Sequence, residues 1–301
     1  MRVLVTGSRG FVAGWLLPHL ESRGDVVVGL DSEVDVTDAA ALADAVTRAA
    51  PEGICHLAAQ ASVHDSWVDP ATTFAVNAVG TVNLLQAALA CRRRPRVLLV
   101  SSSEVYGRVD AESLPVREDH PFAPASPYAA SKAAAELAGL QAWLGSSLEV
   151  VRARPFNHTG PGQRPDFVVP ALAQQVAEAV RRGVGTLRTG NLAARRDITD
   201  VRDVVRAYRD LLVAGAPGEV YNVCRGESVA IEQVARRLLE LAGVDIPIVA
   251  DAQRMRPADL PEMRGDPARL HGATGWVPEI PLDVTLGDVL DHWVRQGSAA
   301  G

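Results

Sequence analysis

The chain has 301 residues, of which 48% are hydrophobic and 22% are charged, and its formal net charge is -6. This length predicts one large domain or a domain with a smaller partner, and the acidic balance argues against a nucleic-acid binder. No apolar run reaches the roughly 20 residues that a membrane span requires, and the first residues lack the apolar core of a signal peptide. Three separated cysteines predict reduced thiols in a cytoplasmic protein, with neither a disulfide framework nor a metal site.

Strand-like and helix-like segments alternate through the first half of the chain. Apolar strands are predicted at Val3–Thr6, Val26–Leu30, Ile54–Leu57, Arg96–Val100 and Leu148–Arg152. Helices are predicted at Phe11–Arg23, Asp38–Ala50, Asp69–Cys91 and Ser126–Leu144. Continuous Val, Leu and Ile runs between such helices are typical of a parallel sheet that helices cover on both faces. The pattern therefore predicts an α/β fold with a doubly wound parallel (Rossmann) sheet.

The pattern loosens after about residue 156, where prolines and glycines cluster. Shorter helices are predicted at 166–182, 200–213, 230–242 and 282–295, with a strand at Val220–Val223. We therefore expect a dinucleotide-binding domain over residues 1–156. Residues 157–301 are expected to form mainly a smaller substrate-binding region, partly interleaved with the Rossmann sheet.

A glycine-rich turn joins the first predicted strand to the first predicted helix, in the segment Thr6–Ala13. Glycines at such a junction permit a tight turn and a close approach of the backbone to a pyrophosphate, which the helix N-terminus attracts. The residues expected to hold the dinucleotide here are Gly7, Arg9, Gly10, Phe11 and Val12. An ordinary glycine turn is the alternative, but the position between strand and helix favours the dinucleotide.

Asp31 ends the second predicted strand. A carboxylate at this position accepts hydrogen bonds from ribose hydroxyls and repels a 2′-phosphate. Ser32 and Glu33 follow, and no nearby arginine is expected to bind that phosphate, so the pattern favours NAD, with NADP as the alternative cofactor. A turn-forming aspartate is the alternative interpretation of Asp31. Asp35 and Val36, at the next turn, are expected to contact the adenine.

Tyr128 and Lys132 lie four residues apart in a predicted helix, which puts both side chains on one face. Lys132 is the only lysine among 30 basic residues. A neighbouring ammonium favours the phenolate, so we expect Lys132 to lower the pKa of Tyr128 and let it exchange a proton near neutral pH. The same ammonium is suited to hold the nicotinamide ribose.

Three serines follow the fourth predicted strand, in the segment Ser101–Gly107. Ligands of open α/β sheets bind beyond the carboxyl ends of the strands. A serine hydroxyl there can hydrogen-bond a substrate carbonyl or alcohol, although a plain polar turn is the alternative interpretation.

Together these motifs resemble the extended short-chain dehydrogenase/reductase family, which includes nucleotide-sugar epimerases and dehydratases. The resemblance rests on TGSRGF at 6–11, HLAA at 56–59, Asn77, SSSEVYG at 101–107, YAASK at 128–132, RPFNHTGPGQ at 154–163 and RDITDVRD at 196–203. It implies a catalytic group of Ser102, Tyr128 and Lys132. It also implies that the cofactor is lined by Leu57, Ala58, Ala59 and Pro155.

The same resemblance implies where a nucleotide sugar binds. Asn157, Arg196 and Arg256 are expected to face its diphosphate, because arginine gives bidentate contacts to phosphate oxygens. Asp259 is expected to accept hydrogen bonds from the nucleoside. In this family two long helices pair across a two-fold axis, so the resemblance further implies a homodimer through a four-helix bundle.

The segments PFNHTGPGQRPDFVVP at 155–170 and RRDITDVRD at 195–203 look most like those of reductases that form GDP-D-rhamnose. The implied reaction is hydride transfer from the cofactor to C4 of GDP-4-dehydro-6-deoxy-D-mannose, with Tyr128 as the proton donor. Glu104 stands where related dehydratases keep the base that removes the C5 proton, and Ser103 stands where some of them have an acid. GDP-mannose 4,6-dehydratase or a related 4-epimerase is therefore the alternative. A non-catalytic NAD(P)-sensing protein is a further alternative, against which the Tyr128–Lys132 pair argues.

Overall fold

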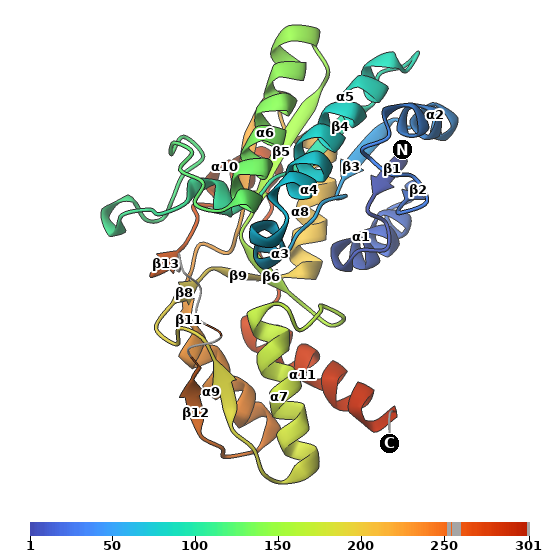
Figure 1. Cartoon of the computed structure of the whole chain (residues 1–301). Helices are drawn as coiled ribbons and strands as arrows, with labels where there is room; N and C mark the ends of the chain where they lie inside the picture. The colour runs from blue at the N-terminus through green and yellow to red at the C-terminus, as the bar shows by residue number, and fades with distance from the viewer. Residues whose placement is uncertain (252–253, 255–259, 300–301) are drawn as a thin grey trace.

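The computed structural model describes residues 1–251, 254 and 260–299. A six-stranded parallel sheet forms its larger part, and a smaller region lies beneath it (Figure 1). The strands run in the order β10 (Val220–Val223), β5 (Val150–Pro155), β4 (Arg96–Val100), β3 (Gly53–His56), β1 (Arg2–Thr6) and β2 (Val26–Leu30). The prediction of a doubly wound α/β sheet is confirmed. The order reverses between β1 and β3, and such a switch point is where open α/β sheets bind ligands.

Helices cover both faces of the sheet, because alternate strand residues point to opposite sides. Val3 and Val5 of β1 pack with α1 (Phe11–Ser22) and α8 (Val201–Ala214). Leu4 packs on the other face, in a cluster with residues of α2, α5 and α6. These helices have the bounds α2 (Ala39–Ala49), α5 (Gly80–Ala90) and α6 (Pro127–Ser146), and α10 (Ala268–Thr274) lies beside α8. The two apolar layers hold the carboxyl edge of the sheet in place.

The helix predicted at Asp69–Cys91 is more divided than the sequence indicates. A separate short helix, α3 (Val63–Val68), precedes it, and Asp69 accepts a hydrogen bond from the Thr72 N–H at the start of the next run. That run, Pro70–Ala90, is continuous and consists of α4 (Pro70–Phe74), a π-helical turn η1 (Ala75–Val79) and α5. By length and composition it is the one described helix that could span a membrane, with mean hydropathy 1.3. However, α2 and α6 pack against it, as expected for a core helix.

The smaller region has its own apolar core, between α7 (Val168–Arg182), α9 (Ile231–Ala242) and α11 (Leu282–Ala299) (Figure 1). Its strands are β6 (Asn157–Thr159), β7 (Leu187–Thr189), β8 (Arg195–Arg196), β9 (Ile198–Asp200), β11 (Val229–Ala230), β12 (Ile248–Ala250) and β13 (Glu262–Met263). They pair as β6 with β9, β7 with β12, and β8 with both β11 and β13. The predicted strand Val220–Val223 forms β10 of the main sheet, next to β5.

Two boundaries bear on the site. The fifth strand was predicted at Leu148–Arg152 but runs from Val150 to Pro155, so Pro155 is its last residue. After β4, a short 3-10 helix, η2 (Ser103–Tyr106), carries the serine segment, and a second 3-10 turn, η3 (Ala111–Ser113), follows. Cys55, Cys91 and Cys224 are free thiols in the described part of the chain.

Candidate active site

The glycine turn after β1 lies against the segment that follows β3. Gly7 has φ +69°, and a Cβ there would lie 2.9 Å from the backbone nitrogen of Ala58. A larger residue would therefore be strained in conformation and would collide with a neighbouring backbone. The Gly10 N–H donates to the Gly7 carbonyl at 3.0 Å, which closes the turn. Gly7 is thus required by the turn that the sequence motif predicts, and a Cβ at Gly10 would lie 3.1 Å from the Gly7 carbonyl oxygen, a tight contact.

Helix α1 presents an open N-terminus beside this turn. Gly10 is its N-cap residue, and no side chain in the described part of the chain caps it. The first N–H groups, at Phe11 and Val12, therefore keep their donors for an anion, with the positive end of the helix dipole behind them. This tight turn and uncapped helix fit the pyrophosphate of a dinucleotide. Leu57, Ala58 and Ala59 follow β3 and are partly buried, whereas Pro155 is buried.

Asp31 and Arg9 meet at the end of β2. The Asp31 carboxylate accepts the N–H of Arg9 at 2.7 Å and the N–H of Ser32 at 2.8 Å. Burial acts to raise the pKa of Asp31, but the hydrogen bonds from these two N–H groups outweigh it and lower the pKa. The Arg9 guanidinium pairs with Glu33 at 3.0 Å and lies 3.5 Å from the Ser32 hydroxyl. The expectation that no arginine lies near Asp31 is therefore wrong, because the glycine turn supplies one.

Asp35 and Val36 have structural partners. The Asp35 carboxylate accepts both the N–H and the hydroxyl of Thr37, each at 2.8 Å, which fixes the turn before α2. Val36 packs on Gly80, where an added Cβ would lie 2.6 Å from the Val36 side chain. The expected contact of these residues with adenine remains a prediction.

Ser102, Tyr128 and Lys132 come together at the carboxyl edge of β4. The Ser102 hydroxyl is hydrogen-bonded to the Tyr128 phenol and accepts the N–H of Glu104 at 3.2 Å. The Lys132 ammonium donates to the carbonyl of Val100, the last residue of β4, at 2.5 Å. Ser102 and Lys132 are both buried. The i, i+4 spacing on α6 thus brings the phenol and the ammonium to the strand end where the serine lies.

The electrostatics of this group differ from the expectation. Burial raises the pKa of Tyr128 to about 12; the Ser102 hydrogen bond lowers it, and the Glu104 carboxylate adds to the rise. Burial lowers the pKa of Lys132 to about 8, while Glu136 acts to raise it. The expected lowering of the Tyr128 pKa by Lys132 is therefore wrong for this structure, because burial dominates. A phenol with a high pKa is a proton donor at neutral pH rather than a proton acceptor.

Glu104 and Ser103 lie within η2. Glu104 is partly exposed, and its carboxylate is close enough to Tyr128 to raise the pKa of the phenol. Ser103 is buried. A carboxylate beside the catalytic phenol is compatible with removing a substrate proton as well as with a passive role.

A buried chain of hydrogen bonds beneath the site was not predicted. The Thr6 hydroxyl accepts the Ala58 N–H at 3.2 Å and lies 2.8 Å from His56 Nδ1. On the other side of the ring, His56 Nε2 lies 3.0 Å from the Thr81 hydroxyl, which donates to the Asn77 carbonyl at 2.6 Å. These directions place the imidazole proton on Nε2. Burial and Lys132 lower the pKa of His56 to about 3, so the ring is neutral.

Asn77 continues this chain to helix α6. Its side-chain amide accepts the Gln60 N–H at 2.8 Å and donates to the Ser131 hydroxyl at 2.9 Å. Asn77 lies in the π-helical turn, and Ser131 directly precedes Lys132. HLAA and Asn77 were sequence signals for these residues, but spacing alone does not reveal that β3, η1 and α6 meet.

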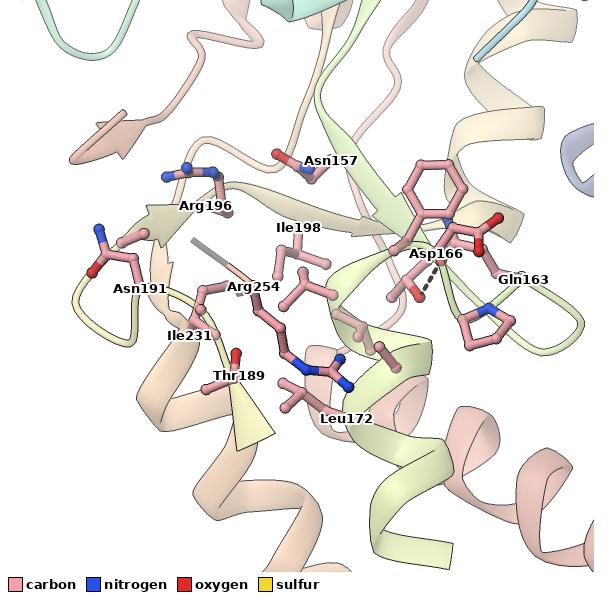
Figure 2. Close-up of a pocket in the computed structure, with 18 of the residues that line it drawn as sticks. Asn157, Gln163, Asp166, Leu172, Thr189, Asn191, Arg196, Ile198, Ile231 and Arg254 are labelled. Atoms are coloured by element: carbon pink, nitrogen blue, oxygen red, sulfur yellow. Dashed lines mark hydrogen bonds between the residues drawn. The ribbon is translucent and has the colours of Figure 1, made fainter. Parts of the chain in front are cut away.

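A pocket of about 270 Å³ lies where β6, β7, β8 and α7 meet. Figure 2 shows Asn157 and Arg196 on its upper side and Thr189 and Leu172 on its lower side. Asn157 follows the end of β5 by two residues, so the pocket continues from the edge of the main sheet. The lining combines cations, amides and aliphatic side chains, a combination suited to a charged ligand with a flat ring.

Arg196 is held at the pocket by its neighbours. Its guanidinium donates to the carbonyls of Arg195 at 2.9 Å and Leu260 at 2.7 Å. The next residue, Asp197, is fully buried and accepts the N–H groups of Arg225 and Gly226 at 2.8 and 2.9 Å. Burial raises the pKa of Asp197 to about 6, although the hydrogen bonds from these two N–H groups act to lower it. Arg256 and Asp259, the other predicted substrate residues, lie outside the described residues.

Comparisons with known proteins agree with this geometry. A sequence model described as GDP-mannose 4,6 dehydratase matches residues 32–289. The chain is 39% identical to a GDP-6-deoxy-D-mannose reductase of Pseudomonas aeruginosa, over 97% of each chain. Its structure resembles that of RMD from Pseudomonas aeruginosa complexed with NADPH, at 37% identity and TM-score 0.92, over 98% of this chain and 100% of the other.

A UDP-glucose 4-epimerase of Thermus thermophilus, solved in complex with NAD, is also similar. It shares 32% identity and a TM-score of 0.87, over 97% of this chain and 99% of the other. One of these two solved structures holds NADPH and the other holds NAD, on the same fold.

Proposed function

We propose that this chain, which belongs to the NAD-dependent epimerase/dehydratase family of extended short-chain dehydrogenases/reductases, reduces GDP-4-dehydro-6-deoxy-D-mannose to GDP-D-rhamnose. Family membership makes it an enzyme and a nucleotide-sugar oxidoreductase of the GDP-mannose dehydratase and reductase branch. The specific reduction is supported above all by the 39% identity, over 97% of each chain, to a GDP-6-deoxy-D-mannose reductase. The Tyr128 phenol, hydrogen-bonded to Ser102, is placed to donate the proton. Such a group is protonated at neutral pH, as reduction of a ketone requires.

The proposed reaction divides the work among three side chains. Reduced nicotinamide, when bound, supplies the hydride that C4 of the sugar receives. The Tyr128 phenol donates its proton to the C4 oxygen as that oxygen gains negative charge, and the Ser102 hydroxyl hydrogen-bonds the same oxygen. An ammonium has three N–H donors, and the Val100 carbonyl accepts one from Lys132, which leaves two for ribose hydroxyls.

We propose that the cofactor site accepts both NADH and NADPH. Asp31 provides the carboxylate for the ribose hydroxyls of NADH. Arg9, exposed and paired with Glu33, provides a cation that a 2′-phosphate would attract at the same strand end. The preference for NAD that the sequence indicates remains a prediction. The position of Arg9, paired with Glu33 beside Asp31, supports NADPH as a second cofactor.

The nucleotide part of the substrate is proposed to occupy the pocket of Figure 2. Arg196, Arg188 and Arg254 line it, and guanidinium groups bind phosphate oxygens in bidentate geometry. The aliphatic side chains of Leu172 and Ile198 suit the flat face of a base. A guanosine diphosphate is the nucleotide that the family match supports.

One observation favours a second function, GDP-mannose 4,6-dehydratase. Glu104 faces Tyr128 from η2, where a carboxylate is placed to remove a proton from the sugar. Dehydration needs such a base at C5, and reduction at C4 does not. The Glu104 carboxylate therefore provides the clearest test between the two reactions.

The decisive assay offers purified protein two substrates. With GDP-4-dehydro-6-deoxy-D-mannose and reduced cofactor, we expect loss of the reduced nicotinamide absorbance and formation of GDP-D-rhamnose, identified by NMR. With GDP-mannose and oxidised cofactor, we expect no 4-keto product. The reverse outcome would assign the dehydratase reaction instead.

We also propose that the chain forms a homodimer through helices α3 to α6. Large apolar side chains are exposed on these helices, including Trp67, Val68, Leu137 and Leu144, and Val68 and Leu144 are 75% and 73% exposed. Helices α3, α4 and α5 pack beside α6, so these side chains lie on neighbouring helices, and exposed apolar surface of this kind marks interaction sites. Leu137→Asp should convert a dimer to a monomer in light scattering, whereas Val184→Asp, at an exposed residue beyond α7, should not. A wild-type monomer would contradict the proposal.

A further inference from the structure

A buried ion pair lies one helical turn beyond Lys132. Tyr128, Lys132 and Glu136 follow each other at intervals of four on α6, so the three share one face. Glu136 has no exposed surface. The Arg154 guanidinium, from β5, donates to both of its carboxylate oxygens, with Nη2 at 2.7 Å and Nε at 3.0 and 3.1 Å. Arg152, also from β5, lies 3.4 Å from the same carboxylate.

Arg154 also contacts the segment that carries Ser102. Its guanidinium donates to the Glu118 carbonyl at 3.0 Å and lies 4.7 Å above the centre of the Tyr106 ring. Tyr106 is the last residue of η2, the short helix that Ser102 caps. One guanidinium therefore touches both halves of the catalytic group: α6 through Glu136, and the serine segment through Tyr106.

Stability alone is a weak reason for this arrangement. Removing two charges from water costs several kcal/mol per ion, and replacing a buried pair by apolar side chains is often neutral or stabilising. Three cations, Lys132, Arg152 and Arg154, approach the Glu136 carboxylate. Without that carboxylate their charges would repel one another in a low-dielectric interior.

We propose that Glu136, clamped by Arg154, is a positioning residue that keeps the Lys132 ammonium charged and holds α6 in place against the Ser102 segment. The titratable groups around Lys132 are Tyr128 and Glu136, one turn to either side of it on α6, and His56 on β3, with Arg152 and Arg154 paired to Glu136. His56 is neutral because burial lowers its pKa to about 3, and Tyr128 stays protonated because burial raises its pKa to about 12. Glu136 is thus the one described carboxylate in this set that offsets the burial of Lys132.

The test uses the fact that Lys132 is the chain's only lysine. Protein labelled with 13C at the lysine ε-carbon gives one lysine resonance, and its chemical shift against pH reports the Lys132 pKa directly, with no substrate. The wild-type midpoint is expected near 8, where burial places the pKa. In Glu136→Gln the midpoint should fall by about one pH unit or more, since a nearby opposite charge typically shifts a pKa by 1–3 units.

Two further variants complete the experiment. Glu149→Gln, at an exposed carboxylate paired with Arg96, is the control and should leave the midpoint unchanged. Glu136→Asp keeps the negative charge but moves it further from Lys132, because the side chain is one methylene shorter. The midpoint of this variant should therefore fall between those of Glu136→Gln and wild type. Should Glu136→Gln fail to fold, Glu136→Asp decides. An unchanged midpoint in the folded Glu136 variants would overturn the proposal.

The dependence of activity on pH tests whether Glu136 also affects the reaction. This measurement rests on the proposed reductase function. Because the ammonium is required, activity should fall as pH rises through the Lys132 pKa, and this alkaline limb should move to lower pH in Glu136→Gln. A merely structural role would lower activity at every pH without moving the limb. Absence of wild-type reductase activity would contradict the proposed function and leave the NMR result to judge the inference.

Discussion

The two halves of the site are built in different ways. The catalytic half sits on strands of four to six residues, and Ser102 and Lys132 are 7% exposed and hydrogen-bonded in place. The substrate half is formed by strands of two or three residues, and Asn157 and Arg188 are exposed there. This difference indicates that the catalytic side chains are held in position before the substrate binds. The substrate-binding side chains lie on short segments, which buried groups such as Asp197 hold together. Variants should therefore change kcat in the first half and KM in the second.

The largest effect is expected in the catalytic half, from Tyr128→Phe. Loss of a positioned proton donor should lower kcat by about 10²–10⁴-fold, while NADPH affinity measured by fluorescence titration stays unchanged. Tyr221→Phe is the matched control, since Tyr221 lies in β10 of the main sheet and its hydroxyl accepts the Ala216 N–H. Normal turnover by Tyr128→Phe would remove the phenol from the mechanism.

Arg196→Ala should have the next largest effect, and in the substrate half. A hydrogen bond to a charged group contributes about 1.5–3 kcal/mol, so KM for the GDP-sugar should rise about 10- to 100-fold with kcat nearly unchanged. Arg195→Ala is the control, because this neighbouring side chain bonds Ser228 instead. Equal KM changes in the two variants would contradict the assignment of the pocket.

Arg9→Ala tests a contact of the cofactor rather than of the substrate. We expect kcat/KM to fall about tenfold with NADPH and to stay nearly constant with NADH, because only the former has a phosphate for the guanidinium. Glu33→Gln, which releases Arg9 from its ion pair, should act in the opposite direction. If both cofactors lose activity in the same ratio, Arg9 does not read the 2′-phosphate.

The smallest effect is expected for Glu104→Gln. In a reductase the carboxylate transfers no proton, so kcat should change by less than about threefold, compared with the 10²–10⁴-fold loss that removal of a general base produces. Steady-state rates with the 4-keto substrate provide the measurement. A severe loss would favour the dehydratase.

The two regions also differ in how much of their structure the sequence could predict. Apolar runs of four or more residues can be recognised in the sequence as strands. All strands of the main sheet were therefore predicted, including Val220–Val223. Strands such as Arg195–Arg196 are too short for any periodicity, and pairing between distant segments decides them. Motif spacing placed Tyr128 and Lys132 on one helix face, and the family resemblance added Ser102; the structure brings the three side chains to the carboxyl edge of β4.

The spacing of motifs in the sequence does not reveal the surroundings of the side chains that the motifs contain. The pKa of Tyr128 is raised by burial, and the side chains that shift it further are Ser102 and Glu104 rather than Lys132. Arg9 reaches Glu33 only because the turn after β1 folds beside the end of β2. Glu136 and Arg154 are eighteen positions apart on different elements, and their contact is visible only once α6 packs on β5.

The most direct measurement of the proposed reaction follows the hydride itself. Protein incubated with GDP-4-dehydro-6-deoxy-D-mannose and NADPH that carries deuterium at the transferable C4 position should yield GDP-D-rhamnose with one deuterium at sugar C4, seen by mass spectrometry and NMR. Product without deuterium at C4, or no product from this substrate under any cofactor, would contradict the account.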